Sequence, residues 1–437
     1  MTIWNKEIET MPVAAMQELQ LGRLKELVAR VYRNVPFYRE RLQAVGITLE
    51  DIKSLKDIAK LPMTTKQDMR DNYPYGLLAV PLKDIARFHS SSGTTGRATA
   101  VAYTKNDLAM WAESLGRTLA AGGLGSSSIF QVAVNYGMFT GGLGMHYAAE
   151  TVGAAIVPAS SGSPVRQALL MQDFGVTDVI ITPSYALHLA EAMQAQGIDP
   201  KAIGLKAVFC GAEAWSDGMR LEIERSFGAP TYDVYGLSEI IGPGVATDCR
   251  CQEGLHLHED LFYPEVIDPV TGEVLPEGAV GELVLTTLSK EGMPMLRYRT
   301  RDLTALERKP CTCGRTGITM KRVTGRSDDM LIIRGANVFP SQIESVLLEM
   351  GATAPHYQLI VDRKNNLDEL TVLVEPTEEG YTELGEAGMR RLEKTIQNQL
   401  KAVLNVKANV QMVLPRTLER SEGKAKRVVD KRKLNLL

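Results

Sequence analysis

The pattern of apolar and polar residues divides the chain into amphipathic helical segments and short apolar strands. Between residues 13 and 35 apolar side chains recur at helical spacing, and Pro36 ends the pattern, so an amphipathic helix is predicted there. From residue 104 onward helical and strand-like segments alternate. We expect helices at residues 104–121, 138–152, 164–174 and 185–196, and strands at 129–134, 154–157, 179–181 and 207–210. Because strand, helix and strand follow one another, the predicted fold class is α/β, with a largely parallel sheet covered on both faces.

The pattern changes twice in the second half of the chain. From about residue 265 short strands, expected at 265–267 and 281–287, alternate with turns containing Pro and Gly, which indicates antiparallel or barrel-like structure. From about residue 327 helices expected at 341–350 and 383–403 accompany strands at 358–361 and 369–374. We therefore predict a large N-terminal domain, residues 1–327, with mainly parallel sheets and a small barrel-like β region, and a small mobile α+β C-terminal domain, residues 328–437.

Composition is that of a soluble globular enzyme. The chain has 437 residues, of which 44 % are apolar and 23 % charged, enough for two cores. Its 49 basic and 52 acidic residues give a formal charge of −3, which favours neither nucleic acid nor a membrane surface as a partner. No basic segment followed by an apolar run begins the chain, and no apolar run has membrane-spanning length, so a cytoplasmic protein is expected. The five cysteines do not indicate a disulfide framework.

A loop rich in hydroxyl groups and glycine, Ser-Ser-Ser-Gly-Thr-Thr-Gly-Arg, covers residues 90–97. Its glycines allow a turn that a Cβ would obstruct, and its amides and hydroxyls are hydrogen-bond donors suited to phosphate oxygens. A flexible linker has a similar composition, but apolar residues on both sides favour a loop held between strands. The spacing is not that of a Walker A loop. The candidate phosphate ligands are Ser91, Ser92, Gly93, Thr94, Thr95 and Gly96.

Five further polar stretches are candidates for a binding site. Tyr235 offers a face on which adenine could stack, and Glu239 a carboxylate for a magnesium ion on phosphates. Asp302 could accept both hydroxyls of a ribose. Residues 61–68 predict a loop entering a helix capped by Thr64 or Thr65; Lys66 either reaches a phosphate or stays exposed beside the cap. The five stretches are residues 209–213, 232–239, 297–302, 325–338 and 420–427.

Together and in this order, these stretches resemble the adenylate-forming superfamily of acyl-CoA synthetases, luciferases and peptide-synthetase adenylation domains. The resemblance covers nearly the whole chain and is strongest to the phenylacetate-CoA ligase family. It is carried by residues 91–96, 135–142, 211–215, 235–239, 297–302 and 421–427. It implies an AMP-forming ligase of aromatic catabolism that uses ATP and Mg²⁺ to convert an aryl acid into an acyl adenylate and transfers the acyl group to coenzyme A.

The resemblance also implies roles for individual residues. The glycine loop would hold the β- and γ-phosphates, with Thr94 among the catalytic residues, although Arg97 stands where many relatives have lysine. Glu239 would ligate Mg²⁺, and Asp328 would be the hinge of the small domain. Lys424 would contact the substrate carboxylate and the α-phosphate, and the nearby Lys426 is the alternative. The remaining nucleotide contacts would be Gly211, Ala212, Glu213, Asp233, Tyr235, Gly236, Asp302 and Arg326.

The chemistry of such a site requires cations, because an anionic carboxylate must attack an anionic phosphate. Rotation of the small domain would then remove Lys424 and admit the thiol. The candidate acyl pocket, a slot for a flat ring, is formed by Tyr136, Phe139, Gly141, Ile240 and Pro243, with Gly137, Gly142 and Ile241 nearby. The alternative is that these glycines only let a helix pack closely. Phenylacetate is the expected acid, although indoleacetate, a hydroxylated phenylacetate and a benzoate would also fit.

The cysteines suggest a separate metal site. Two Cys-x-Cys pairs, 249–251 and 311–313, and two nearby histidines offer soft ligands for a structural zinc ion. The best four are Cys249, His256, Cys311 and Cys313, with Cys251 and His258 as alternates. Buried thiols without a metal are the competing interpretation, and Cys210 is expected in the core.

Two other functions remain open from the sequence. One is an adenylation enzyme that loads a carrier protein instead of coenzyme A. The other is a nucleotide or aryl acid sensor without turnover, although Glu239, Asp302 and Lys424 argue for catalysis. The family likeness implies a homodimer.

Overall fold

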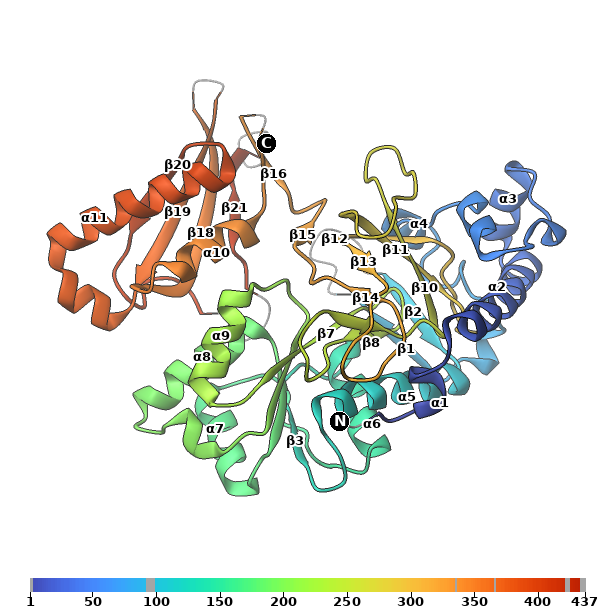
Figure 1. Cartoon of the computed structure of the whole chain (residues 1–437), viewed down its shortest axis with the longest axis horizontal. Coiled ribbons are helices and arrows are strands. Elements are labelled where there is room, and N and C mark those ends of the chain that lie inside the picture. Colours follow the sequence, from blue (N-terminus) through green and yellow to red (C-terminus); the bar gives the residue numbers. More distant parts are fainter. Residues whose placement is uncertain (1–2, 92–98, 335, 365–366, 421–424, 433–437) are drawn as a thin grey trace. The chain divides into compact units, whose positions relative to one another are not determined.

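The computed structural model describes residues 3–91, 99–334, 336–364, 367–420 and 425–432 (Figure 1). The chain forms two compact units. The first contains residues Met1–Ile181, Lys201–Ala212 and Ala229–Arg322, and the second contains Thr182–Pro200, Glu213–Gly228 and Val323–Leu437. None of the described helices is long and apolar enough to cross a membrane.

A nine-stranded sheet of the first unit carries most of the candidate site, counted over the described residues. Its strand order is β13-β14-β9-β8-β7-β6-β5-β3-β4. The strands from β3 to β7 run parallel, as predicted, and β8, β9, β13 and β14 continue the sheet in antiparallel pairs. The bounds are β3 Ile129–Val132, β4 Ala155–Val157, β5 Asp178–Ile181, β6 Ala207–Gly211, β7 Thr231–Leu237, β8 Gly242–Thr247, β9 Leu255–Leu257, β13 Leu306–Glu307 and β14 Thr319–Met320.

Helices α5 (Lys105–Gly122), α6 (Thr140–Thr151) and α7 (Pro164–Phe174) alternate with these strands and confirm the α/β prediction. α5 begins with a capping box, in which Thr104 and Asp107 bond each other's backbone amides, and ends at Gly123, whose φ is 102°. α5 and α6 pack on each other and on β8. Trp111 of α5 is 2 % exposed, and Cys210 of β6 is fully buried in the core, as expected.

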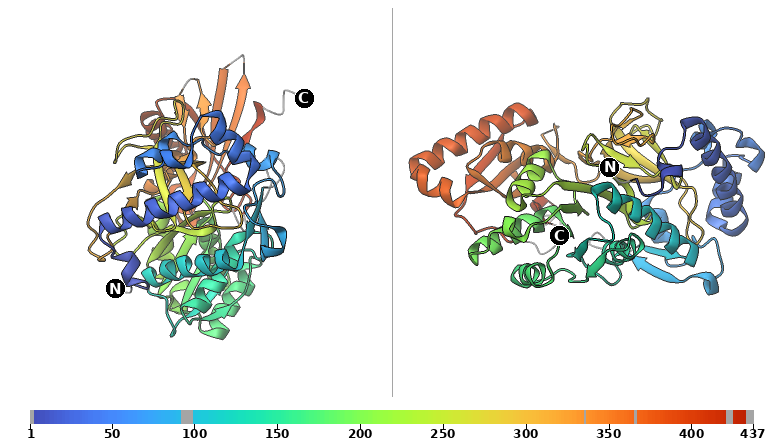
Figure 2. Two further views of the ribbon diagram at one scale, coloured as in Figure 1. Left: turned by 90° about the vertical axis from the view of Figure 1, so that its right-hand side faces the viewer. Right: turned by 60° about the horizontal axis from the view of Figure 1, so that its bottom comes forward.

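The rest of the first unit is antiparallel sheet and N-terminal helices. β10 (Phe262–Ile267), β11 (Gly281–Thr287) and β12 (Tyr298–Thr304) pair antiparallel, which confirms the change of pattern near residue 265. β1 (Arg87–Ser90) pairs with β2 (Ala100–Tyr103). The helices are α1 (Lys6–Glu9), α2 (Val13–Asn34), α3 (Pro36–Ala44) and α4 (Lys66–Asp71), with 3₁₀ turns at Leu49–Asp51, Leu55–Lys60 and Leu82–Asp84. Figure 2 shows α2, in blue, across this region. The Gln20 side chain of α2 donates 2.9 Å to the Glu259 carbonyl.

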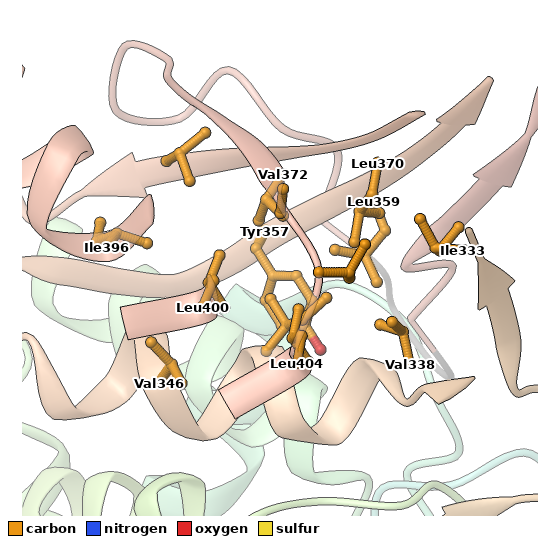
Figure 3. Packing of buried hydrophobic residues seen from close by; sticks show 14 of the residues in the cluster. Ile333, Val338, Val346, Tyr357, Leu359, Leu370, Val372, Ile396, Leu400 and Leu404 are labelled. Atoms are coloured by element: carbon orange, nitrogen blue, oxygen red, sulfur yellow. The ribbon is translucent and has the colours of Figure 1, made fainter. Parts of the chain in front are cut away.

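The second unit is an α+β structure around its own core. Its sheet has the order β20-β19-β18-β21, and α10 and α11 pack against it. Figure 3 shows the core between them, where Tyr357 and Leu359 of β18 meet Leu400 and Leu404 of α11. The bounds are α8 Pro183–Ala195, α9 Asp217–Phe227, β15 Gly325–Arg326, β16 Leu331–Ile333, β17 Ala336–Val338, α10 Pro340–Glu349, β18 Thr353–Lys364, β19 Leu367–Pro376, α11 Glu378–Leu404, β20 Ala408–Met412 and β21 Val428–Asp430. A 3₁₀ turn at Pro200–Ile203 begins at the last residue of the segment Thr182–Pro200 and continues into the first unit.

Candidate active site

Hydrogen bonds between Ser91 and Thr99 join the two ends of the glycine loop, and we call this pair of residues the neck of the loop. The Ser91 amide donates 3.1 Å to the Thr99 carbonyl, and the Thr99 amide donates 3.1 Å to Ser91 Oγ. These bonds extend the β1–β2 pair, so the residues on both sides of the loop are strands, as the sequence predicted. The predicted cradle residues Ser92, Gly93, Thr94, Thr95 and Gly96, and Arg97 beside them, lie outside the described residues.

The neck lies against the 135–142 stretch. The Ser90 amide donates 2.9 Å to the Met138 carbonyl, and His89 Nδ1 lies 3.1 Å from the same oxygen. Farther along, Thr140 Oγ1 lies 3.2 Å from Ser238 Oγ. Three stretches that are remote in the sequence therefore meet within the first unit.

Glu239 lies at the tip of a tight turn between β7 and β8. The turn depends on glycine at position 236, because a Cβ there would stand 2.1 Å from the Gly242 carbonyl oxygen. Gly242 itself has φ 109°, a conformation that side chains disfavour. The two glycines thus let β7 reverse sharply into β8, with Glu239, which is 6 % exposed, in the turn between them.

Tyr235 and Asp302, predicted for adenine and ribose, are in direct contact. The Tyr235 hydroxyl donates 2.6 Å to Asp302 Oδ2, and the Asp302 amide donates 3.0 Å to Thr300 Oγ1. Strand β7 supplies the tyrosine and strand β12 the aspartate. The two candidate nucleotide contacts therefore share one place in the fold.

Lys66 forms an ion pair with the predicted magnesium ligand. Its Nζ lies 3.0 Å from Glu239 Oε1. Thr65, not Thr64, caps α4 through a capping box with Asp68. Thr64 is instead buried, and its hydroxyl donates 2.6 Å to the Leu296 carbonyl. The ion pair between Lys66 and Glu239 therefore places the first turn of α4 at the candidate site.

Two buried residues that the sequence analysis did not single out hold the turn after Glu239. Lys290 Nζ donates 2.7 Å to the Ile240 carbonyl, and the Tyr103 hydroxyl donates 2.8 Å to the Ile241 carbonyl. The ammonium lies 4.7 Å from the centre of the Tyr103 ring. Burial lowers the pKa of Lys290 to about 8, and the charges of Asp107 and Glu239 oppose that shift. A single lysine in a loop carries no sequence signal of such a role.

The residues at the end of β6 lie beside β7. Gly211 pairs with Val234, and a Cβ on Gly211 would stand 2.5 Å from the Val234 carbonyl oxygen. Ala212 follows with φ 73°. Asp233 lies one residue before Val234, with Oδ2 3.5 Å from Nε of Arg322. The close pairing of the two strands thus requires glycine at position 211.

The glycines of the candidate acyl pocket differ in the space that a Cβ would have. A Cβ on Gly142 would meet the Asn135 carbonyl oxygen at 2.6 Å, which supports the close-packing interpretation there. Among the described residues beyond its chain neighbours, a Cβ on Gly141 would meet only Val134, at 3.7 Å, and a Cβ on Gly137 would meet no atom within 4 Å. The other predicted pocket residues differ in their surroundings. The Tyr136 hydroxyl lies 3.2 Å from His146 Nδ1, and Phe139 is exposed. Ile240 and Ile241 are fully buried, and the Pro243 carbonyl accepts a 2.8 Å hydrogen bond from Trp111 Nε1. Burial, with Glu150 nearby, raises the pKa of Tyr136 to about 12, so its phenol stays neutral.

The remaining predicted residues belong to the second unit. Arg326 binds Asp328 through two contacts of 2.9 Å. Glu213 accepts from the amides of Ser184 at 2.6 Å and Ala425 at 3.2 Å, and burial raises its pKa. Lys424 lies outside the described residues, and the alternative Lys426 is exposed.

The four preferred metal ligands, Cys249, His256, Cys311 and Cys313, come together in the first unit. The alternates do not join them. Cys251 Sγ lies 3.0 Å from Thr312 Oγ1, and His258 Nε2 lies 3.4 Å from Thr118 Oγ1.

Known proteins resemble this chain over nearly its whole length. Residues 41–289 match the family of AMP-binding enzymes, and residues 335–432 match the AMP-binding enzyme C-terminal domain. Phenylacetate-coenzyme A ligase of Thermus thermophilus is 46 % identical, over 99 % of this chain and 100 % of that protein. The protein of the same name from Aromatoleum evansii is 48 % identical, over 95 % of this chain and 94 % of its own length.

A solved structure agrees with these matches. 2-Hydroxyisobutyryl-CoA ligase in the postadenylation state, in complex with 2-HIB-AMP, superposes with a TM-score of 0.93 at 30 % identity, covering 99 % of this chain and 93 % of that one. Its α/β fold with a C-terminal α+β part is the fold described above. The chain therefore belongs to the AMP-binding enzymes of the adenylate-forming superfamily and, within them, to the family of the phenylacetate-coenzyme A ligases.

Proposed function

We propose that this protein is an AMP-forming aryl-CoA ligase whose substrate is phenylacetate or a close arylacetate. In the first half-reaction a carboxylate oxygen attacks the α-phosphorus of ATP and pyrophosphate leaves. In the second the thiol of coenzyme A attacks the acyl carbon and AMP leaves. The observation that carries the proposal is the 46 % identity to a phenylacetate-coenzyme A ligase over 99 % of this chain.

The geometry of the first unit supports the assignment of the nucleotide site. Asp302 would bind the ribose hydroxyls, oriented by the 2.6 Å bond from Tyr235, and Gly211 and Ala212 would lie along adenine. The loop that continues from Ser91 would bind the β- and γ-phosphates. Gly236 would let the nucleotide approach β7, and Asp233 would support that strand through Arg322.

The residues around Glu239 fit a magnesium ion. Its carboxylate is a hard oxygen ligand. It lies on a turn whose Ile240 and Ile241 carbonyls are bonded by Lys290 and Tyr103. Bound Mg²⁺ would supply positive charge against the phosphates. Lys66, whose Nζ is 3.0 Å from Glu239, would add a second cation beside the same oxygens. Two anionic reactants could then approach each other.

The C-terminal residues would complete the site. Lys424 would balance charge on the substrate carboxylate and the α-phosphate, and Asp328, with Arg326, would be the hinge about which residues 328–437 turn between the half-reactions. Residues 1–327 would remain the nucleotide- and acyl-binding domain. The aryl ring would lie among Tyr136, Phe139, Gly141, Ile240 and Pro243. We propose a homodimer that acts in the cytoplasm, where ATP and coenzyme A are available.

The test is ATP–pyrophosphate exchange with phenylacetate, hydroxyphenylacetate, indoleacetate, benzoate and a fatty acid. We expect exchange with phenylacetate, and, after addition of coenzyme A, stoichiometric thioester and AMP. Exchange without thioester on coenzyme A, but with acylation of a phosphopantetheinylated carrier protein, would assign the enzyme to carrier loading. Nucleotide binding without exchange for any acid would contradict the ligase proposal.

A further inference from the structure

Four side chains that bind soft metals meet at one point, separate from the residues proposed for catalysis. The Sγ atoms of Cys249, Cys311 and Cys313 and an imidazole nitrogen of His256 all lie within 4.8 Å of one another. Cys249, His256 and Cys313 are buried, at 1 %, 4 % and 5 % exposure, and Cys311 is partly exposed. We infer that this cluster binds one Zn²⁺ in a closed structural site with three thiolates and one imidazole.

The distances between the ligand atoms fit a tetrahedral zinc ion. Cys249 Sγ lies 3.7 Å from Cys311 Sγ. Two sulfurs at ~2.3 Å from a tetrahedral zinc ion stand about 3.8 Å apart. His256 Nε2 lies 3.4 Å from Cys313 Sγ, where a Zn–N distance of ~2.0 Å and a Zn–S distance of ~2.3 Å predict about 3.5 Å. The sulfurs of Cys249 and Cys311 are therefore spaced as two ligands of one metal ion, not as partners in a disulfide, whose sulfurs would be ~2.0 Å apart.

Backbone amides point at two of the sulfurs. The Cys251 amide donates 3.4 Å to Cys249 Sγ, and the Arg315 amide donates 3.5 Å to Cys313 Sγ. Such bonds stabilise the thiolate, which is the form that binds a metal. Gly314, which follows Cys313, adopts φ 89°, and its amide donates 3.0 Å to the Cys311 carbonyl. This turn lets two cysteines only two residues apart contribute to one site.

The metal would link two connections at one side of the large sheet. Cys249 follows β8, and His256 lies in β9, while Cys311 and Cys313 lie between β13 and β14. The order β13-β14-β9-β8-β7 makes these strands consecutive neighbours of the strand that carries Tyr235. With four protein ligands no position is left for water or substrate, so the ion is structural and independent of the proposed ligase chemistry.

The experiment is a metal analysis of the full-length protein, purified without a polyhistidine tag and without added metal. We expect about one equivalent of zinc in the wild type, as four protein ligands predict. Cys311→Ser, at the partly exposed ligand, should lose most of this zinc. Cys251→Ser is the matched control, because it removes a thiol two residues from a ligand but outside the cluster, and it should keep the metal.

A second measurement covers the case in which Cys311→Ser does not fold. Co²⁺ exchanged into the wild type should give the visible bands of a tetrahedral complex and the thiolate-to-cobalt charge-transfer band. Three outcomes would overturn the inference: wild-type protein without stoichiometric metal, equal zinc in Cys311→Ser and the wild type, or a disulfide between Cys249 and Cys311 in non-reducing mass spectrometry. Loss of zinc in Cys251→Ser would also contradict the assigned ligand set.

Discussion

The Tyr235 hydroxyl donates a 2.6 Å hydrogen bond to the Asp302 carboxylate, across 67 residues of sequence. The bond links the end of β7 to β12 and therefore orients the carboxylate that we assign to the ribose. A hydrogen bond to a charged group contributes ~1.5–3 kcal/mol. The contact joins two candidate residues that the sequence places far apart.

Tyr235→Phe should therefore weaken ATP binding without removing the aromatic face. We expect the KM for ATP in pyrophosphate exchange to rise roughly tenfold, with a smaller change in kcat. Tyr263→Phe, a partly buried tyrosine of β10, is the control and should leave both constants unchanged. An unaltered KM in Tyr235→Phe would mean that Asp302 is not held by this bond during binding.

Lys424→Ala should separate the two half-reactions. Because the lysine would offset negative charge in adenylate formation only, we expect pyrophosphate exchange to fall roughly 100-fold or more. Thioester formation from chemically prepared phenylacetyl adenylate and coenzyme A should be largely retained. Lys426→Ala, at the exposed neighbour, should behave like the wild type. Equal loss in both half-reactions would show that the lysine does not have this role.

Lys290 should give the protein a measurable dependence of stability on pH. Its pKa is about 8 in the folded state and 10.5 as a free side chain, so between these values the unfolded chain binds more protons. The free energy of unfolding should consequently increase as pH rises from 8 to 10.5. Below pH 8 the buried ammonium reduces stability by a constant amount.

The measurement is urea denaturation of the wild type and Lys290→Met across this range. The difference in unfolding free energy between them should change with pH, because only the wild type carries the buried amine. Lys105→Met, at an exposed lysine, should give a constant difference. We also expect Lys290→Met to raise the KM for Mg·ATP, since the Ile240 carbonyl loses its 2.7 Å donor next to Glu239. A pH-independent difference for Lys290→Met would contradict the lowered pKa of Lys290.

Gly236→Ala should disrupt the β7–β8 turn. Its Cβ would stand 2.1 Å from the Gly242 carbonyl oxygen, a backbone atom that cannot rotate away. We expect a loss of about 2 kcal/mol or more in unfolding free energy and a strong loss of exchange activity. Gly125→Ala is the matched control, because no atom of the described residues beyond its chain neighbours lies within 4 Å of the added Cβ. Wild-type stability in Gly236→Ala would show that the hairpin relaxes more easily than its packing indicates.

Local signals in the sequence determined much of the secondary structure. Helix α7 begins and ends at the predicted residues, because Pro164 starts it and Gly175, with φ 60°, ends it. Pro36 likewise separates α2 from α3. The order of the motifs also predicted the superfamily, and the spacing of cysteines and histidines predicted the four side chains that meet in the metal cluster. Each of these features depends on residues near one another in the chain or on residue types in a set order.

Only the tertiary structure decided which polar groups meet and how they are buried. Thr65 caps α4 while its neighbour Thr64 is buried against Leu296, and Lys290 is buried with its Nζ bonded to the Ile240 carbonyl, one residue after Glu239. Strands β7 and β8 were not predicted as a pair, because the turn between them depends on the approach of Gly236 to Gly242. Contacts between segments tens to hundreds of residues apart depend on the packing of the whole sheet. The spacing of residues along the sequence does not give the distances between such segments. The burial of the site residues, their ion pairs and their pKa values therefore follow only from the folded chain.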